Sequence, residues 1–455
     1  MPGGPADRAL ARMEADGAGA ASLAAFRRRL EQLATPGAGL LAGDELEPLG
    51  DVPALEDLPA PGRAAARAVL DRVVVLKLNG GLGTSMGLAG PKSLVEVKPG
   101  RTFLDVIARQ VLALRERHGV RLPLVLMDSA ATRAPSLAAL ARHPGIAADV
   151  PAGFEQGREP KLRADTHEPV DWPADPRLEW CPPGHGDVYA SLACSGMLEA
   201  LLGAGYRWAF VSNADNLGGL VDPRLAAWVA EEQVPFAMEV VRGTAADRKG
   251  GHLAVRGGRI VLRETAQVPD GDESFGDVAR WRWYNTNDLW IDLAALAALL
   301  GEHDGALDLP VIVNRKTVDP ADAGSPAVLQ LETAMGAAIG AIAGARAVHV
   351  PRSRFAPVKT TDDLLVVRSD AWALHDDGRM VPRFDGPGPF VALDDDHFRR
   401  LADFERRFPY GAPSLVRCRS LRVEGDVSFG AGVAVEGEVT VRGPAHVADG
   451  AELRG

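Results

Sequence analysis

The sequence predicts an α/β protein in which a doubly wound mixed sheet is followed by a short parallel β-helix. From about residue 71, apolar runs of strand length alternate with segments of helical spacing, as in a sheet covered by helices. After about residue 415 the apolar positions recur every six residues, with glycines between them. We therefore expect three parts: an N-terminal helical extension over 1–70, a central α/β domain over 71–365, and a C-terminal domain over 366–455 whose β-helix covers about 415–455.

The predicted elements of the first two parts follow from apolar periodicity and turn residues. In chain order they are a helix at 22–33, a strand at 73–76, a helix at 102–117, a strand at 122–127, a helix at 191–202, a strand at 208–212, a helix at 223–232 and a strand at 235–241. A hairpin of 253–255 and 260–262 about Gly257 and Gly258, a strand at 281–291 and a helix at 328–342 follow. The alternation of strand and helix predicts the doubly wound arrangement.

The tail has two apolar registers with a six-residue period. The first consists of Val423, Phe429, Val435, Val441, Val447 and Leu453, and the second of Leu421, Val427, Val433 and Val439. An antiparallel meander would also alternate, but it does not require a six-residue period, so a β-helix is the favoured interpretation. A β-helix could act in homo-oligomer assembly or as an acyltransferase domain, and the presence of only His446 in the repeat favours assembly.

Net charge, the lack of long apolar runs and the spacing of the cysteines argue against several partners and favour a cytoplasmic location. The formal net charge of -11 argues against nonspecific binding to nucleic acid or to an anionic membrane. No apolar run approaches the roughly 20 residues of a membrane span, and the closest, 334–345, predicts a buried helix. Cys181, Cys194 and Cys418 lack CxxC spacing, which argues against a disulfide framework or a zinc cluster. We expect a cytoplasmic protein.

The stretch "KLNGGLGTSMGLAGPKSL" predicts a phosphate-holding loop directly after the strand at 73–76. It does not match the GxxxxGK[ST] phosphate loop, because Pro91 stands between Gly90 and Lys92. It does not match GxGxxG either, because its glycines give GxGxxxG. What remains is GGxGT followed by a Pro-Lys pair. A flexible turn is the alternative to a loop that holds a nucleotide with Lys92 directed at its phosphates.

With that loop, further blocks make the sequence similar to a known family, the eukaryotic-type UTP-glucose-1-phosphate uridylyltransferases. The blocks are "PPGHGDVYASL", "FVSNADNLG", "KGGHL", "NTNDLW", "VLQLETAMGAAI" and "VPRSRFAPVKTTDDLL". The resemblance runs from about Val73 to the C-terminus, and we expect the extension before Asp71 to lie outside it. It implies a Rossmann-like, glycosyltransferase-A-like nucleotidyltransferase catalytic domain and a left-handed parallel β-helix.

The resemblance also implies a reaction, the transfer of uridylyl from UTP to α-D-glucose 1-phosphate, giving UDP-glucose and pyrophosphate. It implies Mg²⁺ and an in-line attack at the α-phosphorus without a covalent intermediate. Because the attacking phosphate oxygen is already an anion, positioning and charge neutralisation should suffice. The implied catalytic residues are Lys92 and Lys359, although a lone lysine such as Lys359 is more often a solvated surface charge.

The implied binding residues are carried over position by position from the matching blocks. Those for the nucleotide are Leu78, Asn79, Gly80, Gly81, Lys92, Gln156, Gly184 and Lys359. Those for the sugar phosphate are Gly80, Gly81, His185, Asn213, Asp215, Lys249, Asn285 and Asn287. Asp215 is also the implied Mg²⁺ ligand, since it follows a strand and a hard cation prefers carboxylate and phosphate oxygens.

Each of these side chains also has a purely structural interpretation on sequence alone. Asp215 could form a solvated Asx turn, and His185 could be merely structural; nothing pairs it with a nucleophile, so it is interpreted as a binding residue and not as a base. Gln156 offers the donor and acceptor that uracil requires. Asn285 and Asn287 are predicted on one strand face, with Asn287 favoured as the hexose contact.

Two rival functions stay open at this level. One is a pyrophosphorylase for another sugar 1-phosphate, such as that of galactose or N-acetylglucosamine, and "LNGGLGTSMG" and "NTN" favour glucose. The other is a non-catalytic nucleotide-sugar-binding protein. The presence of Lys92, Asp215 and Lys359 together argues against it.

Overall fold

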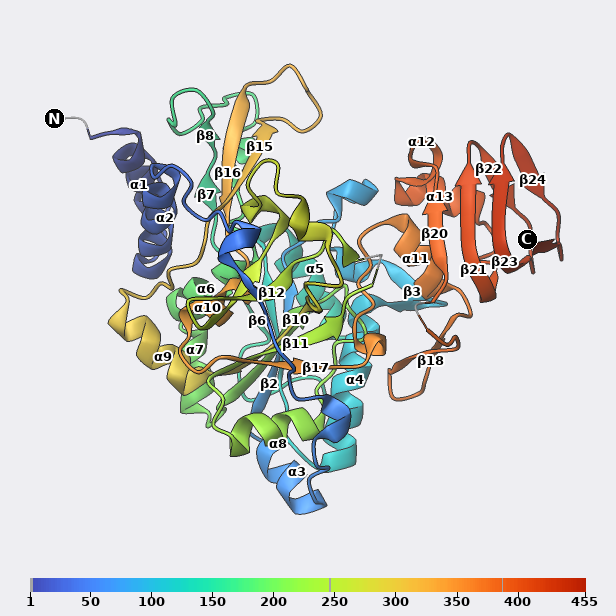
Figure 1. Ribbon diagram of the computed structural model, residues 1–455, viewed down its shortest axis with the longest axis horizontal. Coiled ribbons are helices and arrows are strands. Elements are labelled where there is room, and N and C mark those ends of the chain that lie inside the picture. The colour runs from blue at the N-terminus through green and yellow to red at the C-terminus, as the bar shows by residue number, and fades with distance from the viewer. Residues whose placement is uncertain (1–2, 245–246, 387) are drawn as a thin grey trace.

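A mixed sheet lies at the centre of the molecule (Figure 1). The computed structural model describes residues 3–244, 247–386 and 388–455. Within them the sheet has the order β1-β12-β14-β10-β2-β5-β6, with β11, β13 and β17 attached beside it. Its strands are β1 (Glu47–Pro48), β2 (Val73–Asn79), β5 (Leu124–Asp128), β6 (Gly153–Glu155), β10 (Trp208–Asn213), β11 (Phe236–Arg242), β12 (His252–Arg256), β13 (Arg259–Arg263), β14 (Trp283–Asp292) and β17 (Arg346–His349).

The directions of these strands place several chain segments at one edge of the sheet. Strands β10, β2, β5 and β6 are parallel neighbours, whereas β14 runs antiparallel to β10, so the sheet is mixed as predicted. The carboxyl ends of β2 and β10 therefore meet at the same edge, at Asn79 and Asn213. That is the edge at which open α/β sheets bind ligands.

Helices cover both faces of the sheet, because β2 is buried on both sides and sends alternate residues to two cores. Val73 and Val75 pack with the helices of one face, and Val74 and Leu76 with those of the other. On the first face lie α3 (Arg63–Leu70), α4 (Phe103–His118) and α8 (Pro223–Glu231), and on the second α6 (Val188–Cys194), α7 (Met197–Gly203) and α9 (Leu293–Glu302).

The N-terminal segment contains more structure than the single predicted helix. Helices α1 (Pro5–Ala15) and α2 (Ala20–Leu33) pack through Met13 and Phe26 on Leu162 and Leu329, and β1 pairs with β12 at the sheet edge. The apolar partners belong to a small sheet of β15 (Ile312–Thr317), β16 (Ala327–Glu332) and β8 (Leu162–Arg163). Further short elements are β3 (Glu96–Lys98), β4 (Arg101–Thr102), α5 (Ala130–Leu140), β7 (Glu159–Pro160) and β9 (Trp180–Cys181).

Two predicted helices are wrong in detail. The helix expected at 191–202 is two helices, α6 and α7, because Gly196 adopts a left-handed conformation between them (φ 72°). The segment expected as a helix at 328–342 begins as strand β16, because pairing with β15 and β8 overrides its helical spacing. Only the 3-10 turn Met335–Ala337 and the short α10 (Ala338–Ala341) follow it, so the buried helix expected at 334–345 is much shorter.

The C-terminal strands stack in parallel at one end of the molecule, drawn in red in Figure 1. Before them come α11 (Thr361–Arg368), β18 (Trp372–Leu374), β19 (Met380–Pro382), β20 (Phe390–Leu393), α12 (Asp395–Phe398) and α13 (Leu401–Arg407). The stacked strands are β21 (Ser414–Glu424), β22 (Val427–Phe429), β23 (Ala434–Arg442), β24 (Ala445–Val447) and β25 (Glu452–Arg454). All their mutual pairings are parallel, which excludes the antiparallel meander.

In the part of the chain that the structure describes, no helix combines the length and the apolar character that crossing a membrane requires.

Candidate active site

A pocket of about 270 Å³ lies at the edge where β2 and β10 end. Most of the residues predicted from sequence to bind ligand line it together. Its lining consists of Leu78, Asn79, Gly80, Gly81, Lys92, Ser93, Met127, Gln156, Pro182, Gly184, His185, Asn213, Ala214 and Asp215. The structure therefore gathers four separate sequence blocks into one site.

The glycine loop forms one wall of this pocket. Gly83 and Gly87 adopt left-handed conformations (φ 59° and 70°) on either side of a 3-10 turn, which allows the loop to fold tightly. The Lys92 backbone N–H then donates to the Gly81 carbonyl at 3.2 Å and returns Lys92 to the start of the loop. At Gly80 a Cβ would lie 2.5 Å from Gln156 Oε1, so the Gln156 side chain packs where only glycine fits.

Lys92 joins three segments that meet at the pocket. Its ammonium donates to Asp215 Oδ2 at 2.8 Å and also to the carbonyl of Val358. The other carboxylate oxygen, Asp215 Oδ1, is buried and accepts no hydrogen bond from a described residue. Asp215 therefore holds Lys92 with one oxygen and leaves the second available to a cation or a donor on a ligand.

The His185 side chain is neutral and is oriented by the backbone. The Met335 N–H donates to His185 Nδ1 at 3.0 Å, so Nδ1 is the acceptor and Nε2 carries the proton. Burial, reinforced by the nearby charge of Lys359, lowers the pKa of His185 to about 4. At neutral pH His185 can therefore donate one hydrogen bond from Nε2 without adding charge to the pocket.

Hydrogen bonds behind the pocket wall fix the segments that carry Gln156 and His185. Asp187 Oδ2 accepts from the Gly157 N–H at 2.7 Å and from Ser191 Oγ at 2.5 Å. Asn79 Nδ2 donates to Asp128 Oδ1 at 2.7 Å, and the Gln156 N–H donates to the Asp128 carbonyl, also at 2.7 Å. The loop, Gln156 and the His185 turn are therefore positioned before any ligand binds.

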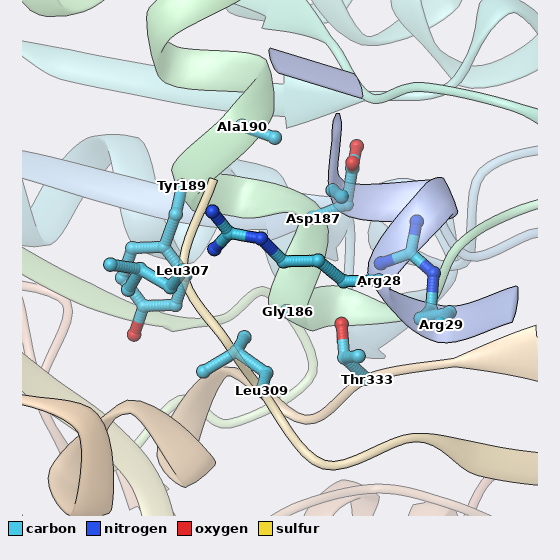
Figure 2. Close-up of a pocket in the computed structure, with 10 residues that line it drawn as sticks. Arg28, Arg29, Gly186, Asp187, Tyr189, Ala190, Leu307, Leu309 and Thr333 are labelled. Atoms are coloured by element: carbon cyan, nitrogen blue, oxygen red, sulfur yellow. The ribbon is translucent and has the colours of Figure 1, made fainter. Parts of the chain in front are cut away.

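A second, much smaller cavity lies on the far side of that turn, between α2 and residues 186–190 (Figure 2). Its volume of about 10 Å³ is roughly that of one water molecule, too small for a substrate. Arg28 and Arg29 of α2 line it together with Thr333, and Arg29 forms a buried ion pair with Glu159. Helix α2 thus packs against the back of the active site and does not form a second site.

Lys359 lies outside the pocket lining but close to it. Its side chain is exposed, and its backbone N–H donates to Asp363 Oδ2 at 2.7 Å at the start of α11. Its charge contributes to the lowered pKa of His185 and opposes the raised pKa of Glu264. The Lys359 ammonium is therefore close enough to His185 and to Glu264 to affect the pKa of both.

Asn285 and Asn287 contact each other, and their strand departs from the regular alternation on which the prediction of a shared face was based. Strand alternation is interrupted because the pairing of β11 with β14 shifts register and Asn287 is left-handed (φ 60°). Asn285 Nδ2 donates to Asn287 Oδ1 at 2.9 Å, and the Asn287 N–H donates to Asn285 Oδ1 at 2.8 Å. A β-bulge brings the two amides together, and neither lines the main pocket.

Glu264 is a polar group near the site that sequence reasoning missed. Burial raises the pKa of Glu264 to about 7, against the opposing effects of Lys359 and a hydrogen bond from Asn285. A Cβ on Gly251 would lie 2.6 Å from its carboxylate. On the same turn, the Lys249 carbonyl accepts from Thr265 Oγ1 at 2.9 Å, while the Lys249 side chain is exposed. In sequence, Glu264 resembles any acidic residue after a strand.

The fold and the pocket define the class of protein. A central mixed sheet, with a glycine loop and a lysine at the carboxyl edge of its parallel strands, fits a nucleotidyltransferase-type fold.

The chain belongs to the UTP-glucose-1-phosphate uridylyltransferase family, whose model matches residues 32–436. The match begins well before Asp71, so our expectation that the whole N-terminal extension lies outside the resemblance is wrong. Between residue 32 and Asp71 the matched segment contains β1, which pairs with β12 at the edge of the central sheet, and α3, which lies on one face of the sheet.

Curated relatives and solved structures agree with this assignment. The chain is 41% identical over 403 residues to a UTP-glucose-1-phosphate uridylyltransferase of Solanum tuberosum, covering 88% of this chain and 80% of the relative. It is 40% identical over 375 residues to a UTP-glucose-1-phosphate uridylyltransferase of Saccharomyces cerevisiae, covering 82% of this chain and 74% of the relative. It superposes on a variant of Leishmania major UDP-glucose pyrophosphorylase in complex with UDP-glucose with a TM-score of 0.93 and 42% identity, over 100% of this chain and 99% of that one.

Proposed function

We propose that this protein transfers uridylyl from UTP to α-D-glucose 1-phosphate, producing UDP-glucose and pyrophosphate. Family membership and the names of the relatives support the reaction class. The observation that carries the proposal is the single pocket in which the glycine loop, Lys92, Gln156, His185 and Asp215 meet. A non-catalytic binding protein would not require a lysine and a carboxylate to converge there.

In this proposal the nucleotide lies along the glycine loop. Backbone groups of Leu78, Asn79, Gly80 and Gly81 hold it, with Gly184 allowing a close approach on the other wall. The Gln156 amide, packed against Gly80 and anchored by its backbone at Asp128, reads the donor and acceptor edge of uracil.

The chemical step is a single displacement at the α-phosphorus. A phosphate oxygen of glucose 1-phosphate forms the new P–O bond, the bond to the β-phosphate oxygen breaks, and pyrophosphate leaves with that electron pair. The nucleophile needs no general base, which agrees with the depressed pKa of His185. His185 Nε2–H and Asn213 orient the sugar phosphate, while Lys92 and Lys359 neutralise charge that develops in the transition state.

Asp215 fits a magnesium ligand. Its Oδ1 is a buried carboxylate oxygen with no hydrogen-bond donor among the described residues. No group of three or more His, Cys, Asp or Glu side chains suited to a metal ion occurs in residues 3–244, 247–386 and 388–455. A single carboxylate completed by phosphate oxygens and water is an arrangement that Mg²⁺ accepts, and the ion would neutralise phosphate charge when bound.

The hexose occupies the side of the pocket mouth nearest β14. Asn285 and Asn287 present neutral amides there, and the Lys249 to Gly251 turn closes over Glu264. Because the pKa of Glu264 is raised to about 7, this carboxyl can serve both as acceptor and as donor to sugar hydroxyls. We extend the predicted hexose site by Glu264.

The remaining sequence predictions are retained as proposals. The division into 1–70, 71–365 and 366–455 follows the N-terminal helices, the central sheet and the C-terminal strands. Leu421 pairs with Val439 and Val427 with Ala445, each 18 residues on, which supports three six-residue sides per coil of a left-handed β-helix.

Assembly into a homo-oligomer through this tail and a cytoplasmic location, consistent with three free cysteines, complete the proposal.

A coupled pyrophosphate-release assay tests the proposed function. The protein is incubated with Mg²⁺, one nucleoside triphosphate and one sugar 1-phosphate, in all combinations of UTP, CTP and ATP with the glucose, galactose and N-acetylglucosamine esters. We expect UTP with glucose 1-phosphate to give the highest kcat/KM. A preference for another sugar ester would replace glucose in the proposal, and no release with any pair would favour the non-catalytic alternative.

A further inference from the structure

The tip of the glycine loop forms part of a second polar pocket, distinct from the one lined by Lys92. This pocket, of about 170 Å³, is lined by Thr84, Gly87, Arg399 and Arg400. The two arginines come from the C-terminal segment between α12 and α13, far from the loop in sequence. The C-terminal domain thus places two guanidinium groups beside the loop that binds the nucleotide in the proposed function.

The backbone of this arginine pair is firmly held. The Arg400 carbonyl accepts from the N–H groups of Asp403 and Phe404, at 3.0 and 2.9 Å, and so starts α13. Phe398 and Phe404 on either side are buried and pack around Phe408, which stacks on Phe429 of the C-terminal strands. The positions of Arg399 and Arg400 are therefore set by a packed aromatic core.

The glycine loop is shaped to receive the Arg400 side chain. A Cβ on Gly87 would lie 3.2 Å from Arg400 Cγ and 3.4 Å from its Cβ. Gly87 is also left-handed (φ 70°), so a larger residue is disfavoured there by both conformation and space. The aliphatic part of Arg400 lies against Gly87, and Arg400 lines the pocket together with Thr84.

The distribution of charge indicates what this pocket binds. In the main pocket the Lys92 ammonium is offset by Asp215, and His185 is neutral. A triphosphate carries more negative charge than Lys359 and a divalent magnesium ion at Asp215 would together balance. Both Arg399 and Arg400 are exposed, and neither guanidinium has a hydrogen-bond or ion-pair partner among the described residues. Guanidinium groups bind phosphate oxygens in bidentate fashion.

The two pockets are close enough to share one triphosphate. Gly81 lines the first and Thr84 the second, and three residues span at most about 10 Å. We propose that Arg399 and Arg400 bind the β- and γ-phosphates of UTP, which become the pyrophosphate product. This inference rests on the proposed function and assigns a leaving-group site to the C-terminal domain.

In the forward reaction the bond between the α-phosphorus and its bridging oxygen breaks, and the electron pair remains on pyrophosphate next to the two guanidinium groups. In the reverse reaction a pyrophosphate oxygen attacks the α-phosphorus of UDP-glucose, and glucose 1-phosphate leaves. The arginines therefore favour pyrophosphate binding in the reverse direction and offset leaving-group charge in the forward direction.

Reverse kinetics test this assignment with the full-length protein. The double variant Arg399→Gln with Arg400→Gln keeps most of the side-chain length but removes both charges, and UTP formation from UDP-glucose and pyrophosphate is measured. We expect the KM for pyrophosphate to rise roughly ten-fold or more, because the substitutions remove both charged hydrogen-bond donors. The KM for UDP-glucose should change less than about two-fold, because its second phosphate is that of glucose 1-phosphate and UDP-glucose lacks both phosphates assigned to the arginines.

Two controls make the result decisive. Arg406→Gln removes an exposed charge from α13, the helix that follows the arginine pair, where Arg406 pairs with Asp403, and should leave both KM values unchanged. The double variant Arg399→Lys with Arg400→Lys should recover part of the pyrophosphate affinity. An unchanged KM for pyrophosphate in the double Gln variant would overturn the inference while wild-type turnover still supports the proposed function. An inactive wild type would instead overturn the proposed function itself.

Discussion

At the level of single residues, the ligand-free pocket is close to electrically neutral. Lys92 and Asp215 pair at 2.8 Å, and His185 carries no charge at neutral pH. This arrangement avoids a concentration of unpaired positive charge in a partly buried site. In the proposed function, substrate phosphates compete with Asp215 for Lys92, and charge from outside the pocket lining, at Lys359 and the arginine pair, becomes important.

Replacement of Lys359 by alanine should lower activity without affecting the fold. The side chain is exposed and supports no packing, so the free energy of unfolding should change by less than about 0.5 kcal/mol. The kcat should fall on the order of 10²–10³-fold, because a cation near the transferred phosphate is lost. Steady-state kinetics measure this, with Lys316→Ala, an exposed lysine of β15, as the control. A near-normal kcat would remove Lys359 from the mechanism.

The substitution Asp215→Asn tests the proposed magnesium ligand. An amide still accepts a hydrogen bond from Lys92 but is a weaker ligand for a hard cation. The Mg²⁺ concentration that gives half-maximal activity should rise about ten-fold or more. The measurement is a Mg²⁺ titration of initial rates at saturating UTP and glucose 1-phosphate. If the titration curve superposes on that of the wild type, another group holds the metal.

The lowered pKa of His185 predicts a pH-dependent contribution to stability. The folded protein titrates His185 at about 4 and the unfolded chain near 6.5, so between these values the unfolded state binds more protons. The free energy of unfolding should therefore fall as pH drops from 6.5 towards 4, by up to about 1.4 kcal/mol per pH unit from this group. Urea unfolding of wild type and His185→Gln at pH 7 and 5 isolates this contribution.

The expected result is a smaller loss of stability at pH 5 in His185→Gln than in the wild type. His303→Gln, which changes an exposed histidine, should lose as much stability as the wild type. Equal losses in His185→Gln and wild type would show that His185 titrates normally in the folded protein.

The pocket residues could be predicted because they lie in continuous blocks that match the family that the sequence resembles. Gln156, His185 and Asp215 were placed this way, and the structure brings them together with the glycine loop. Glu264 and the arginine pair were missed because their significance depends on burial and on contacts between distant segments. Strand alternation predicts Asn285 and Asn287 on one strand face, whereas a β-bulge produces the contact between their side chains.

At the level of elements, a buried group of charges joins the strands beneath the site. Arg354 forms a bidentate pair with Glu239 of β11, at 2.7 and 2.8 Å, and Asn216 donates to both oxygens of Asp288 in β14. Asn216 also donates to the Arg354 carbonyl at 3.0 Å and accepts from the Ala356 N–H at 3.0 Å. The turn that carries Asp215 and the segment that leads to Lys359 are thereby held together.

Removal of one partner from this group should be costly. Arg354→Met leaves Glu239 buried without its cation, and we expect the free energy of unfolding to fall by about 3–5 kcal/mol. The double variant Arg354→Met with Glu239→Gln should recover part of the loss, since no unpaired charge remains buried. Urea unfolding of the three proteins measures both effects. A loss below about 1 kcal/mol in Arg354→Met would contradict the structural role of the pair.

The elements that sequence predicted best are those whose local pattern and tertiary contacts agree. The helix at 102–117 is confirmed as α4, with a Thr102 cap and Gly119 after its end, and the Gly257 and Gly258 hairpin is confirmed as β12 and β13. The segment 328–342 failed because its spacing suits a helix while two neighbouring strands require a partner. Only long-range contacts could have decided that case.

At the level of the whole molecule, the N-terminal extension and the C-terminal domain both pack against segments that carry site residues. Helix α2 packs behind the His185 turn, and the arginine pair of the C-terminal domain packs on the glycine loop. Asp362 of α11 accepts from the Leu393 N–H at 3.2 Å and so joins the segment after Lys359 to β20. In the proposed mechanism, the C-terminal domain therefore adds its arginine pair to a pocket that the central domain lines.

The most direct test of the central claim is to identify the products formed at this pocket. The wild-type protein and Lys92→Met are each incubated with UTP, Mg²⁺ and glucose 1-phosphate, and products are followed by ³¹P NMR. We predict equal amounts of UDP-glucose and pyrophosphate from the wild type and a rate on the order of 10²-fold lower from Lys92→Met. Hydrolysis of UTP without UDP-glucose, or full activity in Lys92→Met, would contradict the claim.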